Sequence, residues 1–202
     1  LAVHTHGPGL FHTKQPVVGL ESLRGMKIRG GTRVVNNMLV KLGATPVGMP
    51  VPAVTEALSK GVLDGTTIPW EVAPALKVHE LVKNHTTFAG DKALYVTTFV
   101  VAMNKGAYNK LPADLKKIID DNSGLEFSAM IARTQDVGDN VGRDLAVKAG
   151  NKITELDVAE VQRWKRTAGV VESDWINDMK AKNIDGAKLV SDARAMIAKH
   201  AK

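Results

Sequence analysis

The sequence predicts an α/β fold with mixed sheets. Short β-branched segments alternate with segments whose apolar residues recur at helical spacing, which is the pattern of strands and helices packed in layers. The clearest unit is a short strand over 26–30 followed by a helix over 32–42. A β-branched and aromatic run over 93–103 and an apolar-periodic stretch from 112 toward 150 add an unusually long strand and an unusually long helix.

Composition is typical of a globular protein. The 202 residues are 44% hydrophobic, which is enough for a core and for one or two domains, and no apolar run is long enough to span a membrane. No charged start followed by an apolar block is present, so we expect any export leader to have been removed. The sequence contains no cysteine, which excludes thiol catalysis and cysteine metal sites.

The net charge of +6 raises the question of a nucleic-acid partner. Lysines and arginines are spread among 21 acidic residues, with no basic run and no patch in which basic and aromatic residues alternate. This distribution is typical of a solvated surface, so we expect no nucleic acid to bind. A basic surface would instead attract anionic ligands.

The strand and helix between residues 26 and 42 meet in a turn suited to an anion. Arg29 ends the strand, Gly30 and Gly31 let an anion approach the backbone, and Thr32 is the predicted N-cap of the helix. A guanidinium beside a helix N-terminus offers two parallel N–H donors and positive potential to one carboxylate. Gly43 stands where a left-handed residue would end the helix.

Three blocks of sequence match those of a known family: they are 23–29 (LRGMKIR), 42–50 (LGATPVGMP) and 56–65 (EALSKGVLDG). In their order and spacing they resemble the DctP-like solute-binding proteins of tripartite ATP-independent periplasmic (TRAP) transporters. The likeness weakens through 111–116 and fades after about Gly150. The resemblance implies a periplasmic receptor that captures a small organic acid and delivers it to the membrane subunits of the transporter. It also implies that Arg29 stands at the position of the family's carboxylate-binding arginine. The effector-binding domain of a regulator is the alternative.

The resemblance further implies two lobes joined by a hinge. On this basis we expect a ligand-binding lobe over 1–95, and a second segment over 96–202 that holds the hinge strand (93–103), a long spine helix and C-terminal helices. Family members are about half as long again, so one lobe is expected to be incomplete, as in a truncated chain. Exposed sheet edge and apolar surface on such a lobe would favour self-association.

The remaining helices follow from local patterns. A helix over 52–60 begins with Pro52 and ends at Gly61, another is expected over 71–83, Asp157 is the predicted N-cap of a third, and the last covers 187–199. The spine helix from Pro112 toward Gly150 contains three glycines at which it could bend or divide, namely Gly124, Gly138 and Gly142.

The loop after Asp64-Gly65 supplies further candidate ligand contacts. Thr66 and Thr67 occupy the positions where the family commonly has polar residues facing the ligand, but Thr66-Thr67-Ile68 replaces the family's common Gln-Glu-Asn. Ile68 and Trp70 make this side of the cleft more apolar, which indicates a ligand with a hydrophobic or aromatic body. Trp70 is equally interpretable as a core residue, and the Glu71 carboxylate as a favourable charge in a first helical turn.

Several other residues are candidate polar contacts or metal ligands. Arg33 is a cation in a first helical turn that an anion would compensate. Asn36 and Asn37 are candidate polar contacts, and Phe11 and His12 are candidates to border the cleft. His4, His6 and His12 could supply three imidazoles, but no carboxylate clusters beside them, so we expect neither metal nor cofactor.

An enzymatic function finds no support in the sequence. Neither a Gly-x-Ser-x-Gly motif, nor a phosphate-binding loop, nor His-Glu-x-x-His occurs. Asp120 and Asp121 are adjacent on a helix and therefore point about 100° apart, as solvated surface residues do. We therefore expect a binding protein rather than an enzyme.

Overall fold

A six-stranded mixed sheet forms the centre of the protein, with strand order β4-β3-β5-β2-β6-β8. The computed structural model describes residues 1–90 and 92–200. Only β2 runs antiparallel to its neighbours, because β3 pairs in parallel with β4 and β5, and β6 with β8. The strands are β2 (Leu10–Thr13), β3 (Lys27–Gly30), β4 (Thr45–Gly48), β5 (Gly65–Ile68), β6 (Asn84–Phe88) and β8 (Lys152–Leu156).

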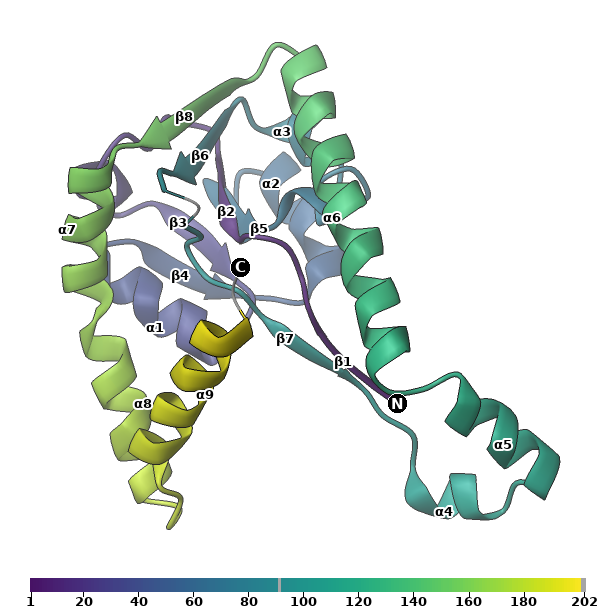
Figure 1. The fold of residues 1–202 in the computed structure, drawn as a ribbon. Helices are drawn as coiled ribbons and strands as arrows, with labels where there is room; N and C mark the ends of the chain where they lie inside the picture. Colours follow the sequence, from purple (N-terminus) through teal and green to yellow (C-terminus); the bar gives the residue numbers. More distant parts are fainter. Residues whose placement is uncertain (91, 201–202) are drawn as a thin grey trace.

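Helices cover both faces of this sheet (Figure 1). One core, which includes Phe11, Ile28 and Trp164, lies under α1 (Arg33–Lys41), α7 (Val158–Ala168) and α8 (Val170–Lys180). The other, which includes Leu58 and Trp70, lies under α2 (Val54–Ser59), α3 (Val78–Leu81) and the C-terminal half of α6 (Leu125–Lys148). The last helix, α9 (Gly186–His200), packs on α8.

A two-stranded ribbon leads away from the sheet. It pairs β1 (Ala2–Thr5) with β7 (Thr98–Val101) in antiparallel register and ends near α4 (Lys105–Asn109) and α5 (Ala113–Asp121) (Figure 1). Helix α6 begins beside α5, runs along β1 and returns the chain to β8. The ribbon and α6 therefore connect the sheet to the α4–α5 end, as expected of a hinge strand and a spine helix. The hinge strand is shorter than predicted, because the run over 93–103 forms only the four-residue β7.

Several local predictions are confirmed. Thr32 caps α1 by accepting a hydrogen bond from the Val35 amide at 3.1 Å, and the Asp157 side chain accepts one from the Glu160 amide at 2.8 Å. The predicted spine helix divides at Gly124, whose φ of 88° is a left-handed conformation that glycine adopts easily.

The prediction of one continuous helix over 71–83 is wrong. The chain forms two short turns of helix there, η3 (Trp70–Val72) and α3 (Val78–Leu81). Pro74 lacks an amide hydrogen, and Lys77 adopts a positive φ of 53°, so a continuous helix cannot pass through this segment. Two further 3-10 turns, η1 (Leu20–Leu23) and η2 (Val51–Ala53), precede β3 and α2.

The proposed division at residue 95 separates the segment with β1 to β6 from the segment that begins with β7. The six-stranded sheet nevertheless takes β8 from the second segment, and α7 and α8 of that segment contact α1 of the first.

Across the described ranges, no helix has both the length and the apolar character required to cross a membrane.

Candidate ligand-binding site

Arg29 lies at the carboxyl end of β3 and is buried, with 5% of its surface exposed. Its Nε donates to the Met49 carbonyl at 3.1 Å and its Nη1 to the Thr67 carbonyl at 3.5 Å. No carboxylate within residues 1–90 and 92–200 forms an ion pair with it. Burial lowers the pKa of the guanidinium, so the charge that Arg29 keeps is costly without an anionic partner.

A cavity of about 180 Å³ lies beside the guanidinium. Its polar lining comes from Arg29, His6 and Tyr95 together with Thr32 and Thr97. The rest of the wall is apolar or aromatic and includes Val51, Ile68, Pro69, Val72 and Phe99. The cavity therefore combines one fixed positive charge with a largely apolar wall, which suits an anion that carries an apolar body.

Thr67 and Gly31 hold the guanidinium in place. The carbonyl of Thr67 accepts hydrogen bonds from both Arg29 and the Tyr95 hydroxyl, the latter at 3.0 Å, and the Thr67 hydroxyl donates to the Arg29 carbonyl at 3.1 Å. A Cβ at Gly31 would lie 3.3 Å from Nη1 of Arg29, closer than most side chains tolerate. The absence of a side chain at Gly31 is therefore what lets the guanidinium lie against the turn.

The other predicted residues of the strand, turn and helix serve the fold. Thr32 borders the cavity, but its hydroxyl oxygen already caps α1. Gly30 lies off the cavity, where a Cβ would be 2.2 Å from the Asn36 side-chain oxygen. Asn37 is exposed, and Arg33 forms an ion pair with Asp178 of α8 at 3.1 Å, which supplies the compensating anion that its position predicted.

Thr66, Trp70 and Glu71 do not line the cavity. Thr66 is fully buried in the sheet, and its hydroxyl has no hydrogen-bond partner among the described residues. Trp70 packs on the rings of His12 and His85, with centroid separations of 5.0 Å and 4.8 Å. It borders a second, more open cavity of about 770 Å³ beside α6.

Glu71 faces α6 and lies against Asp139. Its amide donates to the Asp139 carboxylate at 2.9 Å. Burial, reinforced by the Asp139 carboxyl group, raises the pKa of Glu71 to about 8. Glu71 is therefore largely protonated at neutral pH and joins η3 to α6, instead of offering a carboxylate to the cavity.

Phe11 and His12 do not border the cleft as expected, because they form the buried centre of β2. Phe11 packs against Trp164 in the core. The Nδ1 atoms of His12 and His85 lie 2.8 Å apart, and the Nε2 of His85 accepts from the Asn151 side-chain amide at 3.1 Å. A buried histidine pair with this hydrogen-bonding pattern is a structural element of the sheet.

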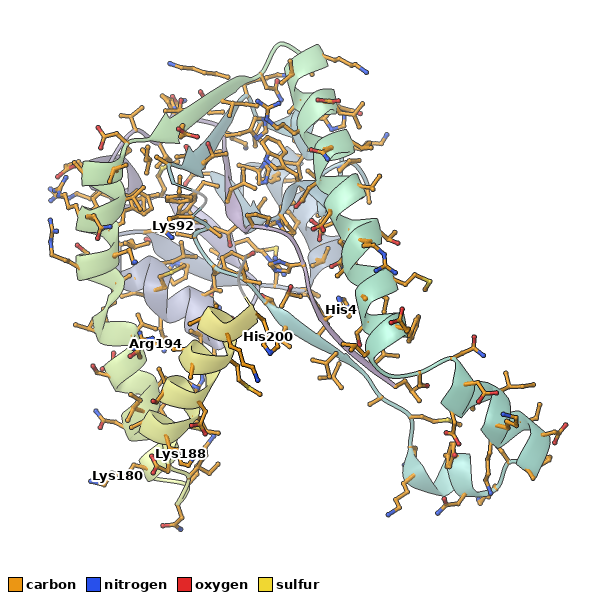
Figure 2. All side chains as sticks on the ribbon, in the orientation of Figure 1. His4, Lys92, Lys180, Lys188, Arg194 and His200 are labelled. Atoms are coloured by element: carbon orange, nitrogen blue, oxygen red, sulfur yellow. The ribbon has the colours of Figure 1, made fainter. Side chains whose placement is uncertain are left out.

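The histidines do not converge on a metal site. His12 is paired with His85, while His4 lies on the β1–β7 ribbon and His200 at the end of α9 (Figure 2). Over residues 1–90 and 92–200, no group of three or more histidine, aspartate or glutamate side chains has the arrangement required to hold a metal ion.

Sequence reasoning missed three aromatic residues of the cavity wall. Tyr95 and Phe99 belong to the aromatic run that predicted the hinge strand, and His6 was weighed only as a metal ligand. Their position next to Arg29 depends on the pairing of β1 with β7, which no local pattern specifies. The aromatic character of the 93–103 run was the available signal.

Several known proteins are similar to this chain in sequence and fold. A TRAP solute-binding protein from Rhodoferax ferrireducens, solved with copurified benzoate, is 51% identical with a TM-score of 0.95, and the match covers 99% of this chain and 63% of that one. A marine metagenome TRAP solute-binding protein described as specific for aromatic acid ligands, solved with metahydroxyphenylacetate, is 45% identical with a TM-score of 0.96, covering 100% and 64% of the two chains. A solute-binding protein of Albidiferax ferrireducens is 30% identical over 92% of this chain.

The chain spans 54% of the length of that last relative and less than two thirds of the two solved structures. The matches are to solute-binding proteins of transport systems, and they give no support to the regulator domain that the sequence left open. The model of the DctP family, described as bacterial extracellular solute-binding protein family 7, matches residues 1–178. With the buried arginine, the mixed sheet and the hinge ribbon in place, the chain belongs to the DctP family of bacterial extracellular solute-binding proteins.

Proposed function

We propose that the protein captures a small aromatic carboxylic acid outside the cytoplasm and delivers it to the membrane subunits of a TRAP transporter. In this proposal the carboxylate binds the Arg29 guanidinium, and the ring of the acid occupies the apolar part of the cavity. The observation that carries the proposal is a buried guanidinium that borders an apolar cavity and has no ion-pair partner within the described ranges.

The size and lining of the cavity favour a compact aromatic acid. A volume of about 180 Å³ is well below the roughly 300–1,000 Å³ typical of sites for drug-sized ligands. Aromatic side chains at Tyr95 and Phe99 and aliphatic ones at Ile68 and Val72 suit the faces and edges of a ring. Two relatives at 45% identity or more are described with aromatic acids bound, which agrees with this choice.

Calorimetric titration with benzoate, using malonate as an aliphatic comparison, tests the proposal. Arg29→Gln should weaken benzoate binding by roughly 2–4 kcal/mol, because it removes a charge-assisted pair in a buried site. Arg33→Gln is the matched control, since Arg33 is exposed and paired with Asp178, and it should bind as the wild type does. If no aromatic acid of this size binds, or if Arg29→Gln retains wild-type affinity, the proposal is wrong.

We also propose that this chain self-associates through the β1–β7 ribbon. The ribbon carries exposed apolar side chains, with 58% of Val3 and 66% of Val100 accessible. Among the described residues, the edge of β7 away from β1 has no strand partner, whereas the Val3 amide on the outer edge of β1 donates to the Ser128 hydroxyl of α6. An open edge with apolar side chains favours pairing with a second copy.

A further inference from the structure

His6 occupies a defined place in the cavity wall next to the proposed carboxylate site. Only 8% of its surface is exposed, and it lines the same cavity as Arg29. Its Nδ1 lies 2.6 Å from the carbonyl oxygen of Gly7. A carbonyl oxygen can only accept a hydrogen bond, so Nδ1 must carry a hydrogen.

This contact fixes the chemistry of the other ring nitrogen. When Nδ1 of a neutral imidazole carries the hydrogen, Nε2 has a lone pair and can only accept a hydrogen bond. Nε2 of His6 has no hydrogen-bond partner among the residues that the structure describes, and it is not among the polar atoms sealed off from the surface. His6 therefore presents an acceptor without a protein donor at the wall of the cavity.

Two aromatic neighbours hold the His6 ring. The Tyr95 ring packs edge-on against it, with centroids 5.4 Å apart and an interplanar angle of 77°. The Phe99 ring lies at 5.7 Å with an angle of 54°. With the Gly7 carbonyl fixing Nδ1 and two rings limiting rotation, the direction of the Nε2 lone pair is set before a ligand arrives.

Tyr95 also relates His6 to Arg29. The hydroxyl of Tyr95 and Nη1 of Arg29 donate to the same carbonyl, that of Thr67, while the ring of Tyr95 contacts His6. One phenol side chain therefore extends from the guanidinium to the imidazole. A benzoate-sized ligand that lies along Tyr95 with its carboxylate on Arg29 would bring its far edge to His6.

We infer that His6 Nε2 accepts a hydrogen bond from a ring hydroxyl of the ligand, so that the site prefers hydroxylated aromatic monocarboxylates to unsubstituted ones. The inference rests on the proposed function and narrows its substrate class. A hydroxyl supplies the donor that Nε2 lacks, whereas a ring C–H placed against Nε2 displaces water from that nitrogen and gives it no donor in return. A methoxy group of similar polarity cannot donate and should not gain the preference.

Calorimetric titrations at pH 8 separate these cases. The ligands are benzoate, 3- and 4-hydroxybenzoate, and the two matching methoxybenzoates. We expect one hydroxybenzoate to bind about tenfold more tightly than both benzoate and its methoxy counterpart, which corresponds to one well-placed hydrogen bond. Equal affinities for the three kinds of ligand would overturn the inference.

Variants of His6 assign the preference to this side chain. His6→Phe keeps an aromatic ring without the acceptor, so the ratio of hydroxybenzoate to benzoate affinity should fall to within about twofold. His6→Gln places an amide near the position of Nε2 and should restore part of the preference. His4→Phe is the matched control, because His4, two residues before His6, stacks on Phe99 but does not line the cavity, and it should keep the wild-type preference.

The outcomes test the role of His6 separately from the proposed function. Benzoate binding that depends on Arg29 but shows no hydroxyl preference, or a preference that survives in His6→Phe, refutes the role of His6 alone. Failure of every aromatic acid to bind the wild type refutes the proposed function as well. If circular dichroism finds His6→Phe unfolded, the wild-type ligand series and His6→Gln decide the question.

Discussion

Acidification from pH 7 to pH 5 is expected to destabilise the fold through the His12–His85 pair. Both side chains are fully buried, and their Nδ1 atoms lie 2.8 Å apart. Burial, with the neighbouring His85, lowers the pKa of His12 from 6.5 to about 3. Burial, with His79 and Lys83 nearby, lowers the pKa of His85 to about 4. Both imidazoles therefore stay neutral in the folded protein at pH 5.

The sign of the effect follows from proton uptake. Below about pH 6.5 the two histidines of the unfolded chain take up protons, while those of the folded chain do not until pH 3–4. The unfolded state then binds more protons, so the free energy of unfolding falls as the pH is lowered through 6.5. Each histidine contributes a loss of about 2 kcal/mol between pH 7 and pH 5, and the pair roughly 3–4 kcal/mol.

Urea denaturation at pH 7, 6 and 5, followed by circular dichroism, measures this loss in the wild type and in His85→Gln. The variant keeps a side chain able to bond Asn151 but removes one titrating group, so its stability should fall by about 2 kcal/mol less than that of the wild type. Glu71, whose raised pKa acts in the opposite direction over this range, is present in both proteins and cancels in the comparison. His200→Gln, at an exposed position on α9, is the control.

An equal pH dependence in the wild type and His85→Gln would refute this reasoning. It would mean that His85 is protonated in the folded protein, or that water reaches the pair. A reduced pH dependence in the His200→Gln control would point instead to a general charge effect.

Two other predictions concern packing and assembly. Gly142→Ala would place a methyl group 2.0 Å from the Trp70 carbonyl oxygen, so α6 must shift. We expect urea denaturation to show a free energy of unfolding lower by about 1–3 kcal/mol. The control Val141→Ala, on the exposed side of the same helix, should lower it by no more than about 0.5 kcal/mol. Sedimentation velocity should detect concentration-dependent self-association that Val3→Lys and Val100→Lys reduce, and a single monomeric species at all concentrations would contradict the proposed ribbon contact.

The sequence was sufficient to predict those features that depend only on residues close together in the chain. Thr32 and Asp157 are short polar residues before amphipathic stretches, so their roles as helix caps follow without tertiary information. Arg29 is predicted to be the carboxylate contact because a strand end, a glycine pair and a helix start coincide at one point of the chain. Gly124 was one of three glycines at which the spine helix could bend or divide; the helix divides there, while α6 continues through Gly138 and Gly142.

Elements whose character depends on their surroundings were not predictable in this way. The central strands β2 (LFHT) and β6 (NHTTF) contain buried polar side chains and show no alternation of polar and apolar residues. The two histidines are tolerated there because their rings bond to each other, to the Ile68 carbonyl and to the Asn151 side-chain amide, contacts that only the folded sheet reveals. His6 gains its place at the cavity by the same kind of long-range pairing, between β1 and β7.

The order of strands in the sheet has a consequence for biosynthesis. Strand β6 is flanked by β2, which is made early, and by β8, which follows only after β7, α4, α5 and α6. During translation the outer edge of β6 therefore stays without a partner while all of these elements emerge, which takes several seconds at roughly 5–20 residues per second. An unpaired edge can recruit other chains. The nascent protein thus depends on a late strand to close an early sheet, and this interval is when a holdase chaperone would protect it most.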